Sequence, residues 1–151
     1  MTFDKLAKEL DSINLVALVK YVDKISEITS VTKYNASLFM RDFIVAQDVS
    51  STLLSTAIMC EARAKSQLDT AKAVALLDKS EEYFKEKGQK PTQDLRSAYV
   101  DLDSDVCEAK DLLARASATA SFLKNKIYEF KSAFEATKQI SRDFQATPYE
   151  S

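Results

Sequence analysis

The sequence predicts an all-α fold, in which long helices form an elongated antiparallel hairpin with coiled-coil-like packing and the chain assembles into an oligomer. Two observations predict helices. The 151 residues include one Gly and two Pro, whereas sheets joined by hairpins need turn residues at short intervals. Apolar side chains also recur with a period of 3.6 residues over almost the whole length. The length favours a single helical domain over residues 1–151.

The first helical region covers residues 3–28. Its apolar side chains form one continuous stripe, which contains Phe3, Leu6, Leu10, Ile13, Ala17, Tyr21, Ile25 and Ile28. Asp11 or Ser12 is placed to cap a new helix, so a short helix followed by a longer one fits this pattern. The T-S-V-T run at 29–32 then indicates a connection, with Thr32 as the N-cap of the next helix.

The second helical region covers residues 33–87, where no Gly or Pro occurs. As one helix it would be about 80 Å long at ~1.5 Å per residue. Helix propensity falls between Asp48 and Ser51, so one helix and two helices are both compatible with the sequence. Small side chains repeat on one face, where they would let a neighbouring helix approach closely: Ala57, Cys60, Ala64, Ala71 and Val74.

A corner at residues 88–91 joins the second region to the third. Gly88 supplies the left-handed backbone conformation that ends many helices, and Pro91 cannot extend the helix before it. Thr92 is placed to cap a new helix, with Asp94 in its first turn. The sequence therefore predicts a turn between two helices here.

The third helical region covers residues 92–145, with a pause at D-L-D-S-D-V, and a frayed tail follows at 146–151. Its apolar register is sustained over about five heptads. The seam that this register predicts consists of Val106, Leu113, Ala120, Leu123, Ile127, Phe130 and Phe134. A helix from about 104 to 145 would be ~60 Å long, whereas a compact chain of this length is ~40 Å across. We therefore expect an elongated hairpin that completes its burial in a homo-oligomer.

The chain offers no recognisable catalytic, cofactor or metal site. It contains no His, which is the commonest acid–base group and metal ligand, and a single Gly excludes Gly-rich phosphate loops and nucleophile elbows. The two cysteines, Cys60 and Cys107, are too few for a zinc site and are interpreted as small buried apolar side chains. We therefore expect no cofactor and no enzymatic activity.

The D-L-D-S-D run at 101–105 is similar to the start of an EF-hand calcium loop. Val106 and Leu112 stand where that loop needs Gly and a bidentate Glu. We therefore interpret the acids as caps and charges at the N-terminus of the last helix, and expect no metal ion.

Two pieces of the chain suggest a family. The first is E-Y-F-K-E-K-G-Q at 82–89, and the second is D-S-D-V at 103–106, followed after a long helix by K-Q-I at 138–140. They resemble the UvsY-type recombination mediator proteins of large tailed phages. In that family a helix ends in an aromatic pair and a Gly-containing turn, and a final helix of similar length opens on D-x-D-V. The resemblance covers roughly residues 81–140, and the first 80 residues share only helical character and length.

The resemblance implies an all-helical subunit of a ring-like oligomer that binds single-stranded DNA. It also implies two protein partners: a recombinase, which such proteins help to load, and the single-strand-binding protein that coats the strand. The family has a basic K-x-R just before its aromatic pair, whereas this chain has Asp78, Lys79 and Ser80. Only Lys79 keeps the charge, which leaves open whether DNA contact occurs there or at neighbouring positions.

Cations and aromatic side chains around the corner form the candidate nucleic-acid surface. Cations that neutralise phosphates, beside aromatics that stack on bases, are typical of single-strand binding. The candidate residues are Lys79, Tyr83, Lys85, Lys87, Lys90 and Arg96, beside Phe84 and Tyr99. In the alternative interpretation, Tyr83 and Phe84 pack the corner and the lysines stay solvated. A second basic group on the last helix is interpreted as a solvated flank: Lys124, Lys126, Lys131 and Lys138.

Composition limits the remaining classes of protein. The net charge is −2, unlike the basic balance typical of nucleic-acid binders, although repetition of a patch in an oligomer adds weak contacts together. No uninterrupted apolar run reaches the ~20 residues of a membrane span, and the amphipathic start is not a signal peptide. We expect a cytoplasmic protein without membrane contact, in the host cytoplasm if a phage encodes it. The alternative function is a structural or adaptor coiled-coil protein, in phage assembly for example, that binds no nucleic acid.

Overall fold

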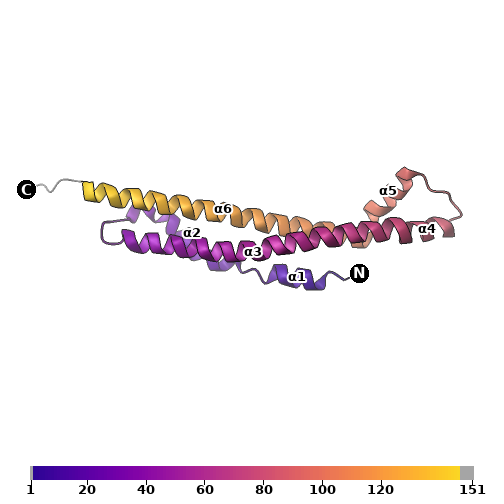
Figure 1. The fold of residues 1–151 in the computed structure, drawn as a ribbon, viewed down its shortest axis with the longest axis horizontal. Coiled ribbons are helices and arrows are strands. Elements are labelled where there is room, and N and C mark those ends of the chain that lie inside the picture. The colour runs from indigo at the N-terminus through magenta and orange to yellow at the C-terminus, as the bar shows by residue number, and fades with distance from the viewer. Residues whose placement is uncertain (1, 147–151) are drawn as a thin grey trace, which may run out of the picture. The chain divides into compact units, whose positions relative to one another are not determined.

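The computed structural model describes residues 2–146, and every regular element among them is helical (Figure 1). This confirms the predicted all-α class. The elements are α1 (Asp4–Asp11), η1 (Leu15–Leu18), α2 (Val19–Ser26), η2 (Ile28–Ser30), α3 (Ala36–Val74), η3 (Ala75–Lys79), α4 (Ser80–Glu86), α5 (Gln93–Leu102) and α6 (Ser104–Ala146). The short elements η1 and η2 are 3₁₀ turns, whereas η3 is a π turn between α3 and α4. Of the predicted frayed tail, only Ala146 is described, and the rest lies outside the described residues.

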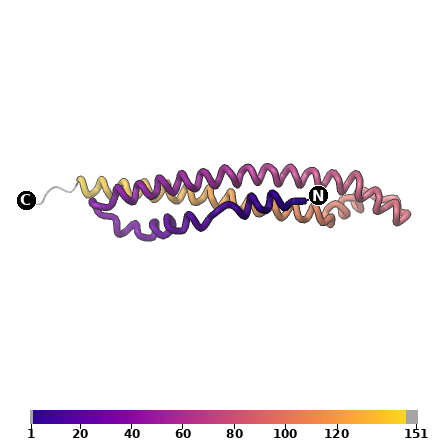
Figure 2. Tube along the Cα trace, turned by 90° about the horizontal axis from the view of Figure 1, so that it is seen from below, coloured from indigo at the N-terminus to yellow at the C-terminus, as the bar shows by residue number. Residues whose placement is uncertain are grey.

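The chain forms two compact units, and each contains parts of both long helices. Unit 1 comprises residues 1–12 and 57–119, and unit 2 comprises residues 13–56 and 120–151. Unit 1 thus pairs the later part of α3 with the earlier part of α6, and unit 2 pairs the other two parts. Within each unit the two long helices lie side by side in both views (Figures 1 and 2). Long helices therefore pack against each other, as the sequence predicted.

In unit 1, the short helix α1 lies against both long helices (Figure 2). Arg63 of α3 pairs with Glu9 at 2.5 Å, and Arg115 of α6 pairs with Asp11 at 2.6 Å. Leu6 of α1 is buried beneath these pairs. The first part of the predicted N-terminal stripe therefore contributes directly to the core of unit 1.

The small side chains of α3 are buried in unit 1. Ala57, Cys60, Ala64 and Ala71 are all buried, and Val74 is half-buried. The part of α6 in the same unit also buries apolar side chains, namely Val106, Ala109, Leu112 and Ala116. Because small side chains let helix axes approach closely, the prediction from their spacing is confirmed as a packing face.

In unit 2, larger side chains fill the core. Phe43 of α3 and Phe130 of α6 are fully buried, and the ring of Tyr21 meets that of Phe130 edge-on at 6.3 Å between centroids. Lys24 of α2 pairs with Asp42 at 3.2 Å. Aromatic packing and one partly buried ion pair thus join the second part of the predicted stripe to the long helices.

The chain itself covers the predicted seam of α6. Val106, Ala120, Leu123 and Phe130 are buried, whereas Leu113, Ile127 and Phe134 are half-buried. Leu112 and Ala133, one residue before two of these half-buried positions, are buried in their place. The buried side of α6 therefore follows the expected register to within one residue, and most of this apolar surface is already covered without a second copy.

Helix α3 runs without a break through residues 48–51, so of the two arrangements that the sequence left open, a single helix is present there. The hydroxyls of Thr52 and Ser55 donate to the carbonyls of Asp48 and Ser51, at 3.0 and 3.1 Å. One local expectation needs correction. Cys107 is exposed rather than buried, because its neighbour Val106 occupies the inward position of that turn. Its thiol instead contacts the Asp101 carbonyl at 3.4 Å.

The start of α3 lies three residues beyond the sequence expectation. The amide of Thr32 donates to Asn35 Oδ1 at 2.6 Å, which forms a turn before the helix begins at Ala36. Thr32 still accepts from the Tyr34 amide at 3.3 Å. Thr32 therefore bonds within a turn that precedes the helix.

One helical stretch of the described chain is long and apolar enough to cross a membrane by length and composition alone. It covers Ala36–Glu86, with a mean hydropathy of 1.4 in its most apolar window. The sequence expectation considered uninterrupted apolar runs, and Ser and Thr interrupt this one. Core helices of soluble proteins pass the same test, so the finding does not by itself place the helix in a bilayer.

Candidate functional site

The corner between α4 and α5, in unit 1, is shaped by backbone hydrogen bonds that the sequence predicted. Gly88 has φ of 65°, the left-handed conformation that favours Gly. The amide of Gln89 donates to the Phe84 carbonyl at 3.0 Å, which closes the end of α4. Thr92 Oγ1 accepts from the Leu95 amide at 3.3 Å and caps α5. These bonds turn the chain so that α5 returns towards α4 (Figure 1).

Three aromatic rings meet at this corner. The centroid of the Tyr83 ring lies 5.2 Å from that of Phe84 and 5.2 Å from that of Tyr99. Phe84 and Tyr99 are 6.2 Å apart. Phe84 is buried, whereas Tyr83 is 43% exposed. Phe84 therefore packs the corner, whereas Tyr83 leaves part of its ring open to solvent.

A largely apolar hollow of about 630 Å³ opens beside these rings. Its walls come from α4, α5 and the start of α6: Tyr83, Phe84, Gln89, Leu95, Ala98, Tyr99, Leu102, Asp103 and Ser104. Leu95 is 46% exposed and Leu102 is 83% exposed. Exposed aliphatic side chains at the rim of an apolar hollow are characteristic of binding surfaces. Sequence reasoning missed Leu95 and Leu102, although both are large apolar residues in a segment otherwise rich in polar ones.

Two of the predicted phosphate-binding cations are held by carboxylates of the chain itself. Lys79 donates to Asp103 Oδ2 at 3.0 Å and to Asp105 Oδ2 at 2.8 Å. Arg96 pairs with Glu81 at 3.0 Å. The sequence grouped Lys79 with the aromatic corner, and it could not show that acids 24 and 26 positions later lie within reach of Lys79.

The Lys79 cluster also organises the start of α6. Asp103 Oδ1 accepts from the Val106 amide at 3.1 Å, so this carboxylate caps α6 while its other oxygen binds Lys79. The hydrogen bond from Lys79 lowers the pKa of Asp105 below its ordinary value. The same bonds, with that to Asp105 the stronger, raise the pKa of Lys79. The acids of D-L-D-S-D thus cap the helix, as the sequence indicated, and also bind a cation of the chain.

The remaining lysines of the corner are exposed. The Lys87 ammonium lies 5.7 Å from the centroid of the Tyr83 ring. Among residues 2–146, Lys85, Lys87 and Lys90 form no ion pair within 4.0 Å. The segment 78–96 nevertheless has no net formal charge, because it contains as many acids as cations. The cations are Lys79, Lys85, Lys87, Lys90 and Arg96, and the acids are Asp78, Glu81, Glu82, Glu86 and Asp94. The corner is therefore not a basic patch as a whole.

The second basic group lies on α6 in unit 2. Lys124 and Lys131 are exposed, Lys138 is half-buried, and Lys126 pairs with Glu129 at 2.8 Å. None of these residues adjoins a described hollow. Lys124 and Lys131 thus agree with the expectation of a solvated flank, whereas the Lys126 side chain, 18% exposed, does not.

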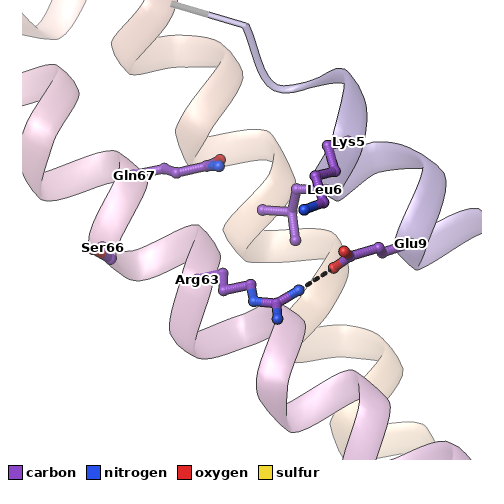
Figure 3. Close-up of a pocket in the computed structure, with 6 residues that line it drawn as sticks. All are labelled: Lys5, Leu6, Glu9, Arg63, Ser66 and Gln67. Atoms are coloured by element: carbon purple, nitrogen blue, oxygen red, sulfur yellow. Dashed lines mark hydrogen bonds and ion pairs between the residues drawn. The ribbon is translucent and has the colours of Figure 1, made fainter.

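A smaller hollow of about 370 Å³ lies between α1 and α3 in unit 1 (Figure 3). Lys5, Leu6, Glu9, Arg63, Ser66 and Gln67 line it. The Glu9–Arg63 pair crosses its mouth, and Gln67 Oε1 is buried without a hydrogen-bond partner in the described part of the chain.

Within residues 2–146, no group of His, Cys, Asp and Glu side chains has the arrangement of a metal site. Comparison of the chain with protein-family models, with curated proteins and with solved structures gives no match.

Proposed function

We propose that this protein is a non-enzymatic helical assembly or adaptor protein that works by binding other protein chains, including copies of itself, through the α4–α5 corner. The observation behind this proposal is the apolar hollow with exposed Tyr83, Leu95 and Leu102 at its rim. Large exposed apolar side chains around a concave surface are where protein interfaces gain most of their binding energy.

Self-association through this corner is physically reasonable because the hollow is almost uncharged. Its only acidic wall residue, Asp103, is already paired with Lys79. In a two-fold dimer the same surface meets itself, so a charged surface would oppose like charges whereas this one would not. An antiparallel long-helix hairpin with coiled-coil-like packing, as the sequence suggested, would present this corner at its bend.

Light scattering during size-exclusion chromatography tests this function. The wild-type chain of 16.9 kDa should elute at a multiple of that mass at about 100 µM. A Leu95→Ser/Leu102→Ser variant should raise the dissociation constant at least about tenfold, since each buried Leu contributes roughly 1.5–3 kcal/mol.

The matched control is Val16→Ser/Tyr34→Ser, which changes two equally exposed apolar residues of unit 2. This control should keep the wild-type mass. A wild-type chain that is monomeric at every concentration would rule out assembly through the corner. An equal rise in the dissociation constant of the corner variant and of the control variant would rule it out as well.

A second function, a phage recombination mediator that binds single-stranded DNA and helps to load a recombinase onto strands coated by single-strand-binding protein, is supported by two observations. One is the resemblance over residues 81–140 to UvsY-type proteins. The other is the set of exposed Lys85, Lys87 and Lys90, of which Lys87 lies over the Tyr83 ring. In this proposal the protein acts in the host cytoplasm, as an oligomer that multiplies weak phosphate contacts.

Fluorescence anisotropy with a labelled oligothymidylate separates the two functions. DNA binding predicts affinity that falls steeply between 50 and 200 mM salt (~10-fold or more for several phosphate contacts). Substituting Lys85, Lys87 and Lys90 by Ala should weaken the affinity for the oligothymidylate. The matched control replaces Lys124, Lys131 and Lys138 by Ala and should leave this affinity unchanged. An assembly protein without nucleic-acid function should show no binding in any of these samples.

A further inference from the structure

Helix α5 is the least securely packed helix of unit 1. It has only 10 residues, from Gln93 to Leu102, and none of them is buried. Isolated helices shorter than about 12–15 residues are marginal in water, so α5 depends on a few contacts with its surroundings. Tyr99 contacts the rings of Tyr83 and Phe84, and Arg96 forms an exposed pair with Glu81. Asp101 forms an exposed pair with Lys110, and its carbonyl accepts from the Cys107 thiol.

Three hollows border α5, which shows how little of it is tightly packed. The apolar hollow of about 630 Å³ lies against Leu95, Ala98 and Leu102. A second of about 680 Å³ lies against Arg96, and a third of about 320 Å³ lies against Ser97 and its neighbours. Segments with few buried contacts open locally at low free-energy cost, so α5 belongs to the low-stability end of this unit.

Both ends of α5 have a backbone that allows rotation as a rigid body. The preceding residues 87–92 contain Gly88 in the left-handed conformation and no helix. At the other end, Asp103 is a single extended residue, with φ −62° and ψ 133°, between α5 and α6. Short non-helical segments of this kind absorb the dihedral changes of hinge motions.

A strong polar cluster fixes the side chain of Asp103, the residue that follows α5. Lys79, the last residue of the π turn η3, binds Asp103 at the hinge and Asp105 in the first turn of α6. The Asp103 side chain is 6% exposed and that of Lys79 is 34% exposed. A π turn holds one more residue than an α turn and therefore sets the rotational position of the residues that follow. Such turns occur frequently at functional sites.

We propose that α5 is a flap over the α4–α5 corner, and that the Lys79–Asp103–Asp105 cluster is the latch that holds it closed. Opening would separate Tyr99 from Phe84, expose this buried ring and widen the apolar hollow. The flap would thereby regulate the corner surface proposed above as a binding site. Its test uses the free protein, so it succeeds or fails independently of what that surface binds.

Hydrogen–deuterium exchange with mass spectrometry on the full chain tests the flap. Lys79→Gln keeps most of the side-chain volume and removes the charge, and should speed exchange of peptides from 93–103 at least about tenfold. The matched control is Lys110→Gln. Lys110 also pairs with an acid of α5, Asp101, but at 3.6 Å and with both groups exposed. This control should exchange like the wild type.

The comparison with other peptides distinguishes a latch from general destabilisation. Peptides from α1 and from the Ala57–Ala71 face should keep wild-type exchange in Lys79→Gln. If exchange in Lys79→Gln rises throughout unit 1, a second variant, Asp105→Asn, distinguishes local opening of α5 from general destabilisation. This variant removes one latch partner and leaves the Asp103 cap of α6 in place. Faster exchange confined to α5 in that variant would support the flap. The flap proposal would be overturned if exchange of peptides from 93–103 did not change in Asp105→Asn. It would also be overturned if these peptides exchanged at equal rates in Lys79→Gln and Lys110→Gln.

Discussion

Single residues decide how the Lys79 cluster responds to pH. The pKa of Asp105 is lowered, chiefly by its hydrogen bond from Lys79. Its contribution to stability is therefore complete above the unfolded-state value of about 3.9 and is lost as pH falls through the lower folded value. The pKa of Lys79 is raised, so its contribution is complete below about 10.4 and is lost as pH rises through the folded value.

We therefore expect the cluster to be intact from about pH 4 to about pH 10. The measurement is the difference in Tm between the wild type and Asp105→Asn across this range, since the subtraction removes the contributions of all other carboxylates. The difference should be constant from pH 5 to 9 (well inside the window) and should shrink as the pH falls below about 4. A difference that stays the same as the pH is lowered to the point of acid unfolding would show that the ionised Asp105 is not the group that binds Lys79.

At the scale of elements, the small-residue face of α3 limits how unit 1 tolerates substitution. Ala64 is fully buried on this face, whereas Ala62 is exposed on the same helix. Ala64→Leu should lower the free energy of unfolding by about 1–3 kcal/mol, because extra carbons have no space in a close helix contact. Ala62→Leu is the control and should change it by less than about 0.5 kcal/mol. Urea unfolding measures both, and equal effects would contradict the close packing of this face.

The helices that the sequence predicts most successfully are those fixed by local signals. Gly88, Thr92 and the acid at Asp103 each act within a few residues, so the corner and the pause before α6 could be predicted from the chain alone. The π turn at Ala75–Lys79 could not, because no residue in it disfavours an α-helix. The break that low propensity suggested near Ser51 is absent, since packing along α3 overrides the weak preference of single residues.

The contacts of the candidate site likewise include some that the sequence predicts and some that it does not. Tyr83 and Phe84 are adjacent in sequence, and their contact with Tyr99 follows from a corner that local signals define. The partner of Lys79 depends on the rotation of one helix against the start of another, which periodicity does not specify. The exposure of an apolar residue such as Leu102 also cannot be predicted from the apolar repeat, because that repeat is read on the assumption that large apolar residues face inwards.

At the scale of the whole molecule, both units take their cores from the same two long helices. This shared use opposes insertion of α3 into a membrane. The stretch Ala36–Glu86 is apolar enough to span a bilayer, and 28% of its most apolar window is buried. Insertion would remove Ala57, Cys60 and Ala64 from their buried positions. It would also separate Arg63 from Glu9. The Asp48 carboxylate would then lie in hydrocarbon, where a charge costs about 2.5–3.5 kcal/mol at the centre of a span.

We therefore expect the folded protein to stay out of membranes. In flotation with phosphatidylcholine–phosphatidylglycerol vesicles, the wild type should remain in the bottom fraction. The positive control is a variant with Leu at the exposed positions Asp48, Ser51 and Ser55 of α3. It gives one face of the helix a continuous apolar surface and should float with the vesicles, because binding grows with the apolar area that reaches the acyl chains. Flotation of the wild type together with this variant would mean that α3 leaves its packed position when lipid is present, and the cores described for both units would then not be the state that meets a membrane.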